Sequence, residues 1–199
     1  MIDLGSATAD EMVLAFLQAE IDSPRFSSWP RHWLLTHRIN RTTLIDNGLL
    51  CDPEQNRLRI EILKGYRGYQ DDRMLFTGFP SNVQWRRVEI ARAELADFRY
   101  ANEPSLIEVS GESRIVGVGA ERFKLGKAPA DFSERVRGVA ECVKNKARFP
   151  DLIAVAAENE PPVLVEGHTR ATAYVYTKPS HPIIVLIGTS PTIKQWHYF

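Results

Sequence analysis

The segment Ile183–Gly188 (IIVLIG) is apolar at every position. A strand that alternates polar and apolar residues can leave one face in water, whereas a continuously apolar strand needs cover on both faces. Two shorter apolar segments, Leu152–Ala157 and Val163–Val165, precede it. These three segments predict the centre of a β-sheet with helices packed on it, which is the arrangement of an α/β or α+β domain.

Two helices are expected around these strands. Thr8-Ala9-Asp10-Glu11 is a capping box, and the apolar residues after it recur at helical spacing, which predicts a helix over about 9–21. Asp131-Phe132-Ser133-Glu134 has the form of a second capping box, and it predicts a helix over Asp131–Lys146. The apolar face of this second helix would comprise Phe132, Val136, Val139, Ala140 and Val143.

The first hundred residues carry weaker signals. Arg57–Lys64 (RLRIEILK) alternates charged and apolar residues, the period of a half-buried strand. Trp85–Ile90 and Ser113–Val118 are further expected strands. Asn102-Glu103-Pro104 is the clearest break in the pattern. We therefore expect a mixed helix/strand region over 1–104 and a second unit over 105–199.

Composition narrows the function classes. Lys plus Arg and Asp plus Glu both total 25, so the chain lacks the net positive field that favours nonspecific DNA binding. No apolar run reaches the ~18–20 residues of a membrane span, and no signal-peptide pattern follows Met1. A cytoplasmic protein with no membrane partner is expected. Cys51 and Cys142 lie outside any CxxC pattern and are expected to be buried free thiols.

The segment Val163–Ala173 (VLVEGHTRATA) is the one that carries chemistry, because a strand leads through the turn Glu166–Arg170 into a short helix over Ala171–Tyr176. Gly167 allows a sharp bend and close ligand approach, since it has no Cβ. The free amides at a helix start favour an anion.

The three residues after this glycine also suit a phosphate. Thr169 adds a hydroxyl, Arg170 a planar fork for phosphate oxygens, and His168 a hydrogen bond or a proton-transfer group. The segment therefore predicts a phosphate site. The alternative is an ordinary turn in which Thr169 caps the helix and Arg170 pairs with a local carboxylate.

These residues resemble the glycine-x-x-arginine-x-x-alanine motif of the ParB/sulfiredoxin superfamily. The turn is most similar to the Asp/Glu-Gly-His-Thr/His-Arg turn of ParB-like free serine kinases. The resemblance implies a small mixed sheet with helices in the second half of the chain. It also implies that Gly167, His168, Thr169 and Arg170 contact nucleotide phosphates, and that Glu166 is a candidate ligand of Mg²⁺.

The chain departs from known members in three places. The kinases carry a His-Glu pair after their first strand, where this chain has Glu121-Arg122-Phe123-Lys124, so Glu121 is only a weak stand-in for the base. The sulfiredoxin cysteine is replaced by Gly167, which speaks against that reductase chemistry. Too few residues follow the motif for the helix-turn-helix DNA reader of partition proteins.

Two functions are therefore expected. The first is an ATP- or ADP-dependent phosphotransferase or phosphohydrolase that acts on an unidentified small molecule or protein side chain. His168 and Glu166 would be its catalytic groups, and the weaker acid/base candidates are Glu112, Glu121 and Asp151. The second is a non-catalytic module for protein or DNA association, with DNA the less favoured partner.

Overall fold

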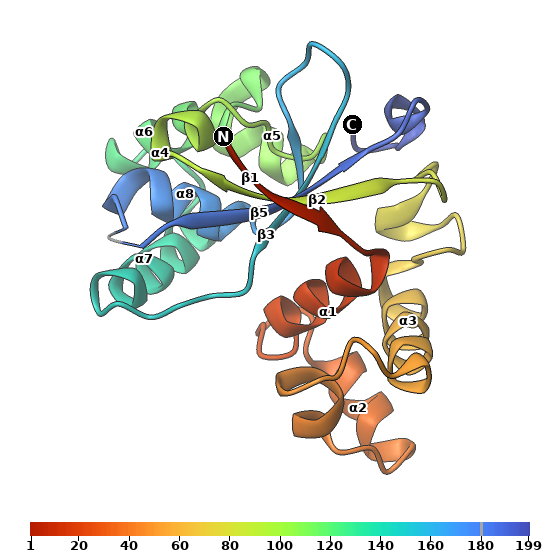
Figure 1. The fold of residues 1–199 in the computed structure, drawn as a ribbon. Coiled ribbons are helices and arrows are strands. Elements are labelled where there is room, and N and C mark those ends of the chain that lie inside the picture. The colour runs from red at the N-terminus through yellow and green to blue at the C-terminus, as the bar shows by residue number, and fades with distance from the viewer. Residues whose placement is uncertain (180) are drawn as a thin grey trace.

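The computed structural model describes residues 1–179 and 181–199, and it has a mixed α+β fold built on a five-stranded sheet (Figure 1). The strands are β1 (Ile2–Ala7), β2 (Gln84–Ile90), β3 (Leu152–Ala156), β4 (Val163–Glu166) and β5 (Ile183–Thr189), in the order β1-β2-β5-β3-β4. β3 and β5 are parallel, and the other neighbouring strands are antiparallel. β5 lies at the centre, as its apolar sequence predicts.

Helices pack on both faces of the sheet (Figure 1). One face is covered by α1 (Ala9–Glu20), α2 (Ser28–Thr36), η1 (Thr42–Asp46), α3 (Pro53–Arg67) and η2 (Met74–Phe76), and η4 (Ile193–Gln195) also packs there. The other face is covered by α4 (Arg92–Ala96), α5 (Pro104–Ser110), α6 (Val116–Lys124), α7 (Ala130–Lys144) and α8 (His168–Thr177), and η3 (Gly111–Ser113) lies between α5 and α6 in the chain. β3 supplies both cores, since Ile153 belongs to the first and Ala154 to the second.

Strands from both sides of the boundary expected at Pro104 share this sheet. β2 pairs with β5 along its whole length, from Gln84 opposite Thr189 to Ile90 opposite Ile183. β1, which the sequence analysis did not anticipate, extends the sheet beyond β2. Within the described residues, no helix has the length and apolar character needed to cross a membrane.

The expected strand over Arg57–Lys64 is wrong, because this segment lies inside α3. The helix begins at the N-cap Asp52, whose side chain accepts hydrogen bonds from the amides of Glu54 and Gln55. The buried side chains of α3 recur at helical spacing, and they include the charged Arg59. Its guanidinium donates to the Leu44 carbonyl at 2.8 Å, so a cation takes a place that the sequence pattern assigned to a surface residue.

Four further expectations need correction, three in the second half of the chain and one at the cysteines. Ser113–Val118 is not a strand, since it spans the end of η3 and the start of α6. α7 begins one residue earlier than expected, with Pro129 as N-cap, so Asp131 lies in the first turn and pairs with Arg135. Val139 is only partly buried, whereas the other four residues of its predicted face are buried. Both cysteines are exposed.

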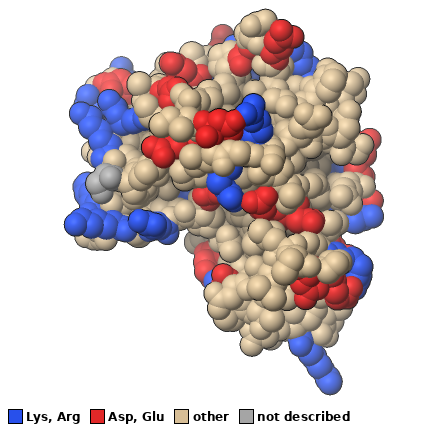
Figure 2. Space-filling model, in the orientation of Figure 1, with Lys and Arg blue, Asp and Glu red and all other residues tan. Residues whose placement is uncertain are grey.

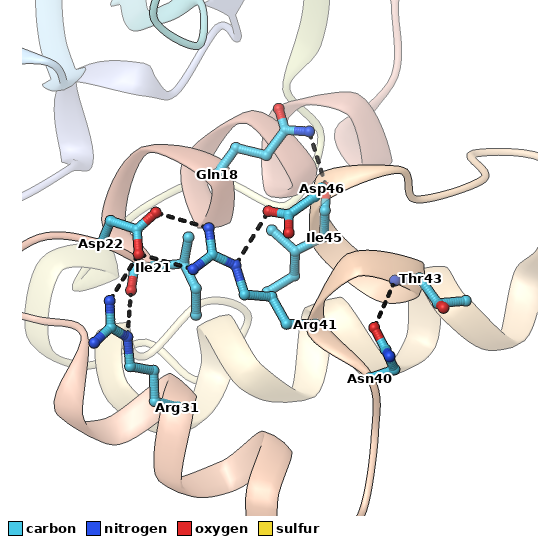
Figure 3. A network of polar contacts seen from close by, with 9 residues as sticks. All are labelled: Gln18, Ile21, Asp22, Arg31, Asn40, Arg41, Thr43, Ile45 and Asp46. Atoms are coloured by element: carbon cyan, nitrogen blue, oxygen red, sulfur yellow. Dashed lines mark hydrogen bonds and ion pairs between the residues drawn. The ribbon is translucent and has the colours of Figure 1, made fainter.

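The helix predicted over about 9–21 is confirmed as α1, with its capping box formed by Thr8 and Glu11. Past its end, a network of exposed ion pairs joins α1 to the next two elements (Figure 3). The Asp22 carboxylate accepts hydrogen bonds from Arg31 at 2.7 Å and from Arg41 at 2.7 and 2.8 Å. The hydrogen bond from Arg41 is the main reason that the pKa of Asp22 is lowered. Because the groups are exposed, this network orients the N-terminal helices more than it stabilises them.

Candidate functional site

The motif Val163–Ala173 forms β4, one turn residue and α8, so the helix begins at His168 and not at Ala171 as expected. The turn residue Gly167 has φ +98°, in the left-handed region. A Cβ on this glycine would overlap the side chain of Leu152. Both backbone conformation and packing therefore require glycine here. Among the residues that the structure describes, no side chain caps α8, so the amides of its first turn have no cap acceptor there.

The substitution Gly167→Ala tests this requirement. We expect it to lower the free energy of unfolding by about 1–2 kcal/mol, because an L-residue is strained at this φ and meets Leu152. Urea denaturation measures the change. Gly138→Ala is the matched control, since Gly138 lies inside α7 with nothing within 4 Å of an added Cβ. The control substitution should leave the free energy of unfolding unchanged or raise it. If Gly167→Ala also left the free energy of unfolding unchanged, glycine would not be required at position 167.

Arg170 is held inside the protein. Its side chain is 8% exposed and forms an ion pair with the Glu166 carboxylate, whose own exposure is 16%. The same guanidinium donates to the Pro150 carbonyl, just before β3. Arg170 thus joins the start of α8 to the end of β4 and the approach to β3. An ion pair between Arg170 and a nearby carboxylate is what we expected if the segment were an ordinary turn and not a phosphate site.

His168 is a partly buried ring beside the first turn. Its Nε2 lies 3.4 Å from the Ala101 amide nitrogen and 3.2 Å from the Leu164 carbonyl oxygen. Burial lowers the pKa of His168 to about 4, although the Leu164 carbonyl opposes the shift. The ring is therefore neutral at pH 7. It can exchange hydrogen bonds there, but its pKa is far from that of an acid or base poised near neutrality.

A second buried ion pair lies close to the first. Arg67 at the end of α3 donates to the Glu20 carboxylate at the end of α1, with 2.9 Å from Nε to Oε2. The Glu20 side chain is 5% exposed, and burial raises its pKa while the hydrogen bond from Arg67 lowers it. The negative charge of Glu166 also raises the pKa of Glu20, which places the two ion pairs in one neighbourhood.

Glu20 and Arg67 were not expected from the sequence, although one signal was present. Glu20 follows Phe16 and Leu17 on the buried face of α1, at spacings of four and three residues. A carboxylate on an apolar helix face has to find a partner when the helix packs. Nothing local identifies Arg67 as that partner, because the two residues meet only through the packing of α1 on α3.

Tyr66 adds a polar group to the same neighbourhood. Its side chain is buried, and the hydroxyl has no hydrogen-bond partner among the residues that the structure describes. The ring stacks on Trp29, with centroids 5.7 Å apart. Burial raises the pKa of Tyr66 well above its usual value, and the Glu20 carboxylate raises it further. Tyr66 therefore presents a protonated hydroxyl beside Glu20.

Arg67 and Arg170 each pair with a glutamate, whereas Arg25 forms no ion pair with any carboxylate of residues 1–179 and 181–199. It is exposed, and its guanidinium carbon lies 4.8 Å from the Phe26 ring centroid. Besides burial, the positive charges of Arg170, Arg25 and Arg67 lower the pKa of His168, so all three charges act on the ring of this first residue of α8. Thr169, also in this turn, is half-buried.

The other acid/base candidates, Glu112, Glu121 and Asp151, lie outside the motif. Glu121 is exposed on α6 and pairs with Lys124 at 3.3 Å, and Glu112 is exposed in η3. Asp151 pairs with Arg87 at 3.1 Å, and its charge raises the pKa of Tyr174 on α8. Of the three, only the charge of Asp151 acts on a described residue of the motif helix, where burial is the larger cause of the raised pKa of Tyr174.

The carboxylates near the turn do not fit the expected Mg²⁺ ion. Glu166 pairs with Arg170, and Glu20 pairs with Arg67, so both are already neutralised by guanidinium groups. Magnesium needs oxygen ligands that are free to complete an octahedral shell. In the part of the chain that is described, no group of three or more His, Cys, Asp or Glu side chains could hold a metal ion. We therefore assign no step to Mg²⁺.

No family model, no curated protein and no solved structure matches this chain. Its function is therefore argued from the residues around the first turn of α8.

Proposed function

We propose that this chain binds a nucleotide through its phosphates at the N-terminus of α8. The observation that carries the proposal is the uncapped first turn of this ten-residue helix, which follows a left-handed glycine and has no side-chain acceptor. Free amides at the positive end of a helix dipole form a ready site for a phosphate oxygen.

The charges around the turn support an anionic ligand. Arg67 and Arg170 are each paired with a glutamate, so they add little net charge and serve as fixed braces. Arg25 is unpaired within the described residues and is the cation left to contact a phosphate directly. The resemblance of Gly167–Arg170 to the ParB/sulfiredoxin motif is the reason to expect a nucleotide and not a simpler phosphate.

The neutral ring of His168 fits binding better than proton transfer. A group with a pKa of about 4 is a weak base for activating an acceptor hydroxyl at neutral pH. The neutral ring therefore supports a binding role for His168. Phosphate release and transfer to small hydroxyl acceptors are measured in the same samples, because turnover there would assign the phosphotransferase or phosphohydrolase activity to the same site.

The experiment is a thermal-shift panel with ATP, ADP, CTP, GTP and inorganic phosphate. A ligand at a hundred times its Kd adds about 2.7 kcal/mol of stability, which is readily detected. Stabilisation by at least one nucleotide, and less by phosphate, is the expected result. If none of the four nucleotides stabilises the protein, the proposal is wrong.

Arg25→Ala is the variant that locates the site. We expect nucleotide affinity to fall about ten-fold, the loss of one charge-assisted hydrogen bond, without a change in stability because the side chain is exposed. Isothermal titration calorimetry measures the affinity. Arg38→Ala is the matched control, since Arg38 is also exposed and has no ion pair within the described residues. Equal affinity in both variants would place the ligand elsewhere.

A further inference from the structure

A second, separate surface gathers positive charge where α6, α7 and α8 end. α8 packs against both α6 and α7. Tyr176 near the end of α8 contacts Phe123 of α6, with ring centroids 5.0 Å apart. The pKa of Lys144 on α7 is raised chiefly by Glu141 and to a smaller extent by Tyr176, so Lys144 is also near this ring. We call this the helix-end surface, and its cations are Lys124, Lys127, Lys144, Lys146, Arg148 and Lys178.

The charge of this surface is local. Residues 121–148 contain eight Lys or Arg and four Asp or Glu, although the whole chain has a net charge of zero. Figure 2 shows Lys and Arg gathered over α6 and α7 at the left of the view. The helix-end surface is therefore a positive region on a neutral protein, and a whole-chain count conceals it.

Several of these cations have no internal partner. Lys124 and Lys144 pair with glutamates of their own helices, at 3.3 and 2.7 Å. The remaining cations have no ion pair with any residue in the described ranges, and all are exposed: Lys127, Lys146, Arg148 and Lys178. They lie beyond the last residues of the three helices, where a favourable interaction with the helix dipole weakens. Their charges are free to meet a polyanion.

Tyr176 gives this surface an aromatic group. The ring is 43% exposed, and its perpendicular contact with Phe123 holds it in place. We propose that the helix-end surface binds single-stranded nucleic acid, with Lys146, Arg148 and their neighbours on the phosphates and Tyr176 stacked on an unpaired base. Positive grooves with exposed aromatic rings bind single strands in this way, whereas the bases of a duplex are stacked on each other and leave no free face.

The test uses fluorescence polarisation of labelled 20-residue dT and rU oligonucleotides over a series of KCl concentrations. We expect Lys146→Gln with Arg148→Gln to weaken binding at least ten-fold and to lower the slope of log Kd against log salt by about 1.4, at about 0.7 per phosphate contact on a single strand. The matched control is Arg38→Gln with Arg57→Gln, which removes two exposed cations from the first half of the chain, one after α2 and one on α3. This control should bind as the unmodified protein does.

The aromatic group is tested separately from the charges. Tyr176→Ala should weaken binding about ten-fold through the loss of one base stack, and Tyr176→Phe should retain it. Melting temperatures of all variants, which should be unchanged, show that the fold is intact. Arg25→Ala should weaken nucleotide binding at α8 and leave oligonucleotide binding unchanged. The two proposals can therefore fail independently of each other.

Three outcomes would overturn the inference: no binding of either oligonucleotide, equal losses in the test and control variants, or tighter binding of a matched duplex. Leu125 is exposed beside the surface, so vesicles of phosphatidylserine and phosphatidylcholine are included. Binding to these vesicles without binding to the oligonucleotides would assign the surface to a membrane and also overturn the inference.

Discussion

Arg170→Ala is expected to lower the free energy of unfolding by about 3–5 kcal/mol, the usual cost of removing one partner from a buried ion pair. The variant leaves the Glu166 carboxylate nearly enclosed and without its cation. It also removes the donor to the Pro150 carbonyl. Urea denaturation measures the loss. An arginine that served only to bind a ligand would leave the stability of the free protein unchanged.

Two further variants separate the buried charge from the lost packing. Arg170→Met with Glu166→Gln removes both charges and keeps much of the side-chain volume, so it should recover a large part of the stability lost in Arg170→Ala. Arg57→Ala is the control, because Arg57 also pairs with glutamates but on the exposed surface of α3, and its removal should have little effect. Equal stability of Arg170→Ala and Arg57→Ala would show that the Glu166–Arg170 pair has no structural role.

Acidification is expected to destabilise the protein through His168. The pKa of this ring is about 4 in the folded protein, below the ~6.5 of an unfolded chain, so the unfolded state binds more protons between these values. The stabilisation is complete above pH 6.5 and is lost as the pH falls towards 4. Integration of this difference gives a loss of about 2 kcal/mol between pH 7 and pH 5.

The measurement is the free energy of unfolding at pH 7 and pH 5 for the unmodified protein and for His168→Gln. Glutamine cannot titrate, so the variant should lose about 2 kcal/mol less over this interval, whatever its stability at pH 7. Comparing the two slopes removes the contribution of carboxylates that titrate in both proteins. Identical slopes would mean that His168 keeps an ordinary pKa in the fold.

Local patterns predicted the elements whose burial follows from their own sequence. β3, β4 and β5 are apolar enough to need cover, and α1 has both a capping box and an apolar face. The segment within α3 was assigned wrongly because RLRIEILK fits both the two-residue period of a strand and the spacing of a helix. The strand pattern requires Arg59 to be exposed, whereas in the fold it is buried and donates to the Leu44 carbonyl. The cap at Asp52 followed by Pro53 is the local signal that favours the helix.

Only the part of the candidate site that comes from the second half of the chain was predictable from the sequence. Gly167 and the start of α8 follow from a strand–glycine–helix pattern. The partners Glu20, Tyr66, Arg67 and Arg25 come from the first half of the chain, and tertiary packing alone brings them to the turn. The same limit applies to Arg170, since its residue type suits a phosphate and a buried glutamate equally well.

The central position of β5 has a consequence for how the chain reaches this fold. The strand is the last of the five in sequence, yet β2 and β3 pair with its two edges. On a ribosome, β1 and β2 emerge early and then wait, with an open strand edge, until residues up to Thr189 have been synthesised. Loop closure over such separations is slow, and an open strand edge can pair wrongly, so the central strand of this sheet is also the one whose late arrival leaves β2 exposed to wrong pairing.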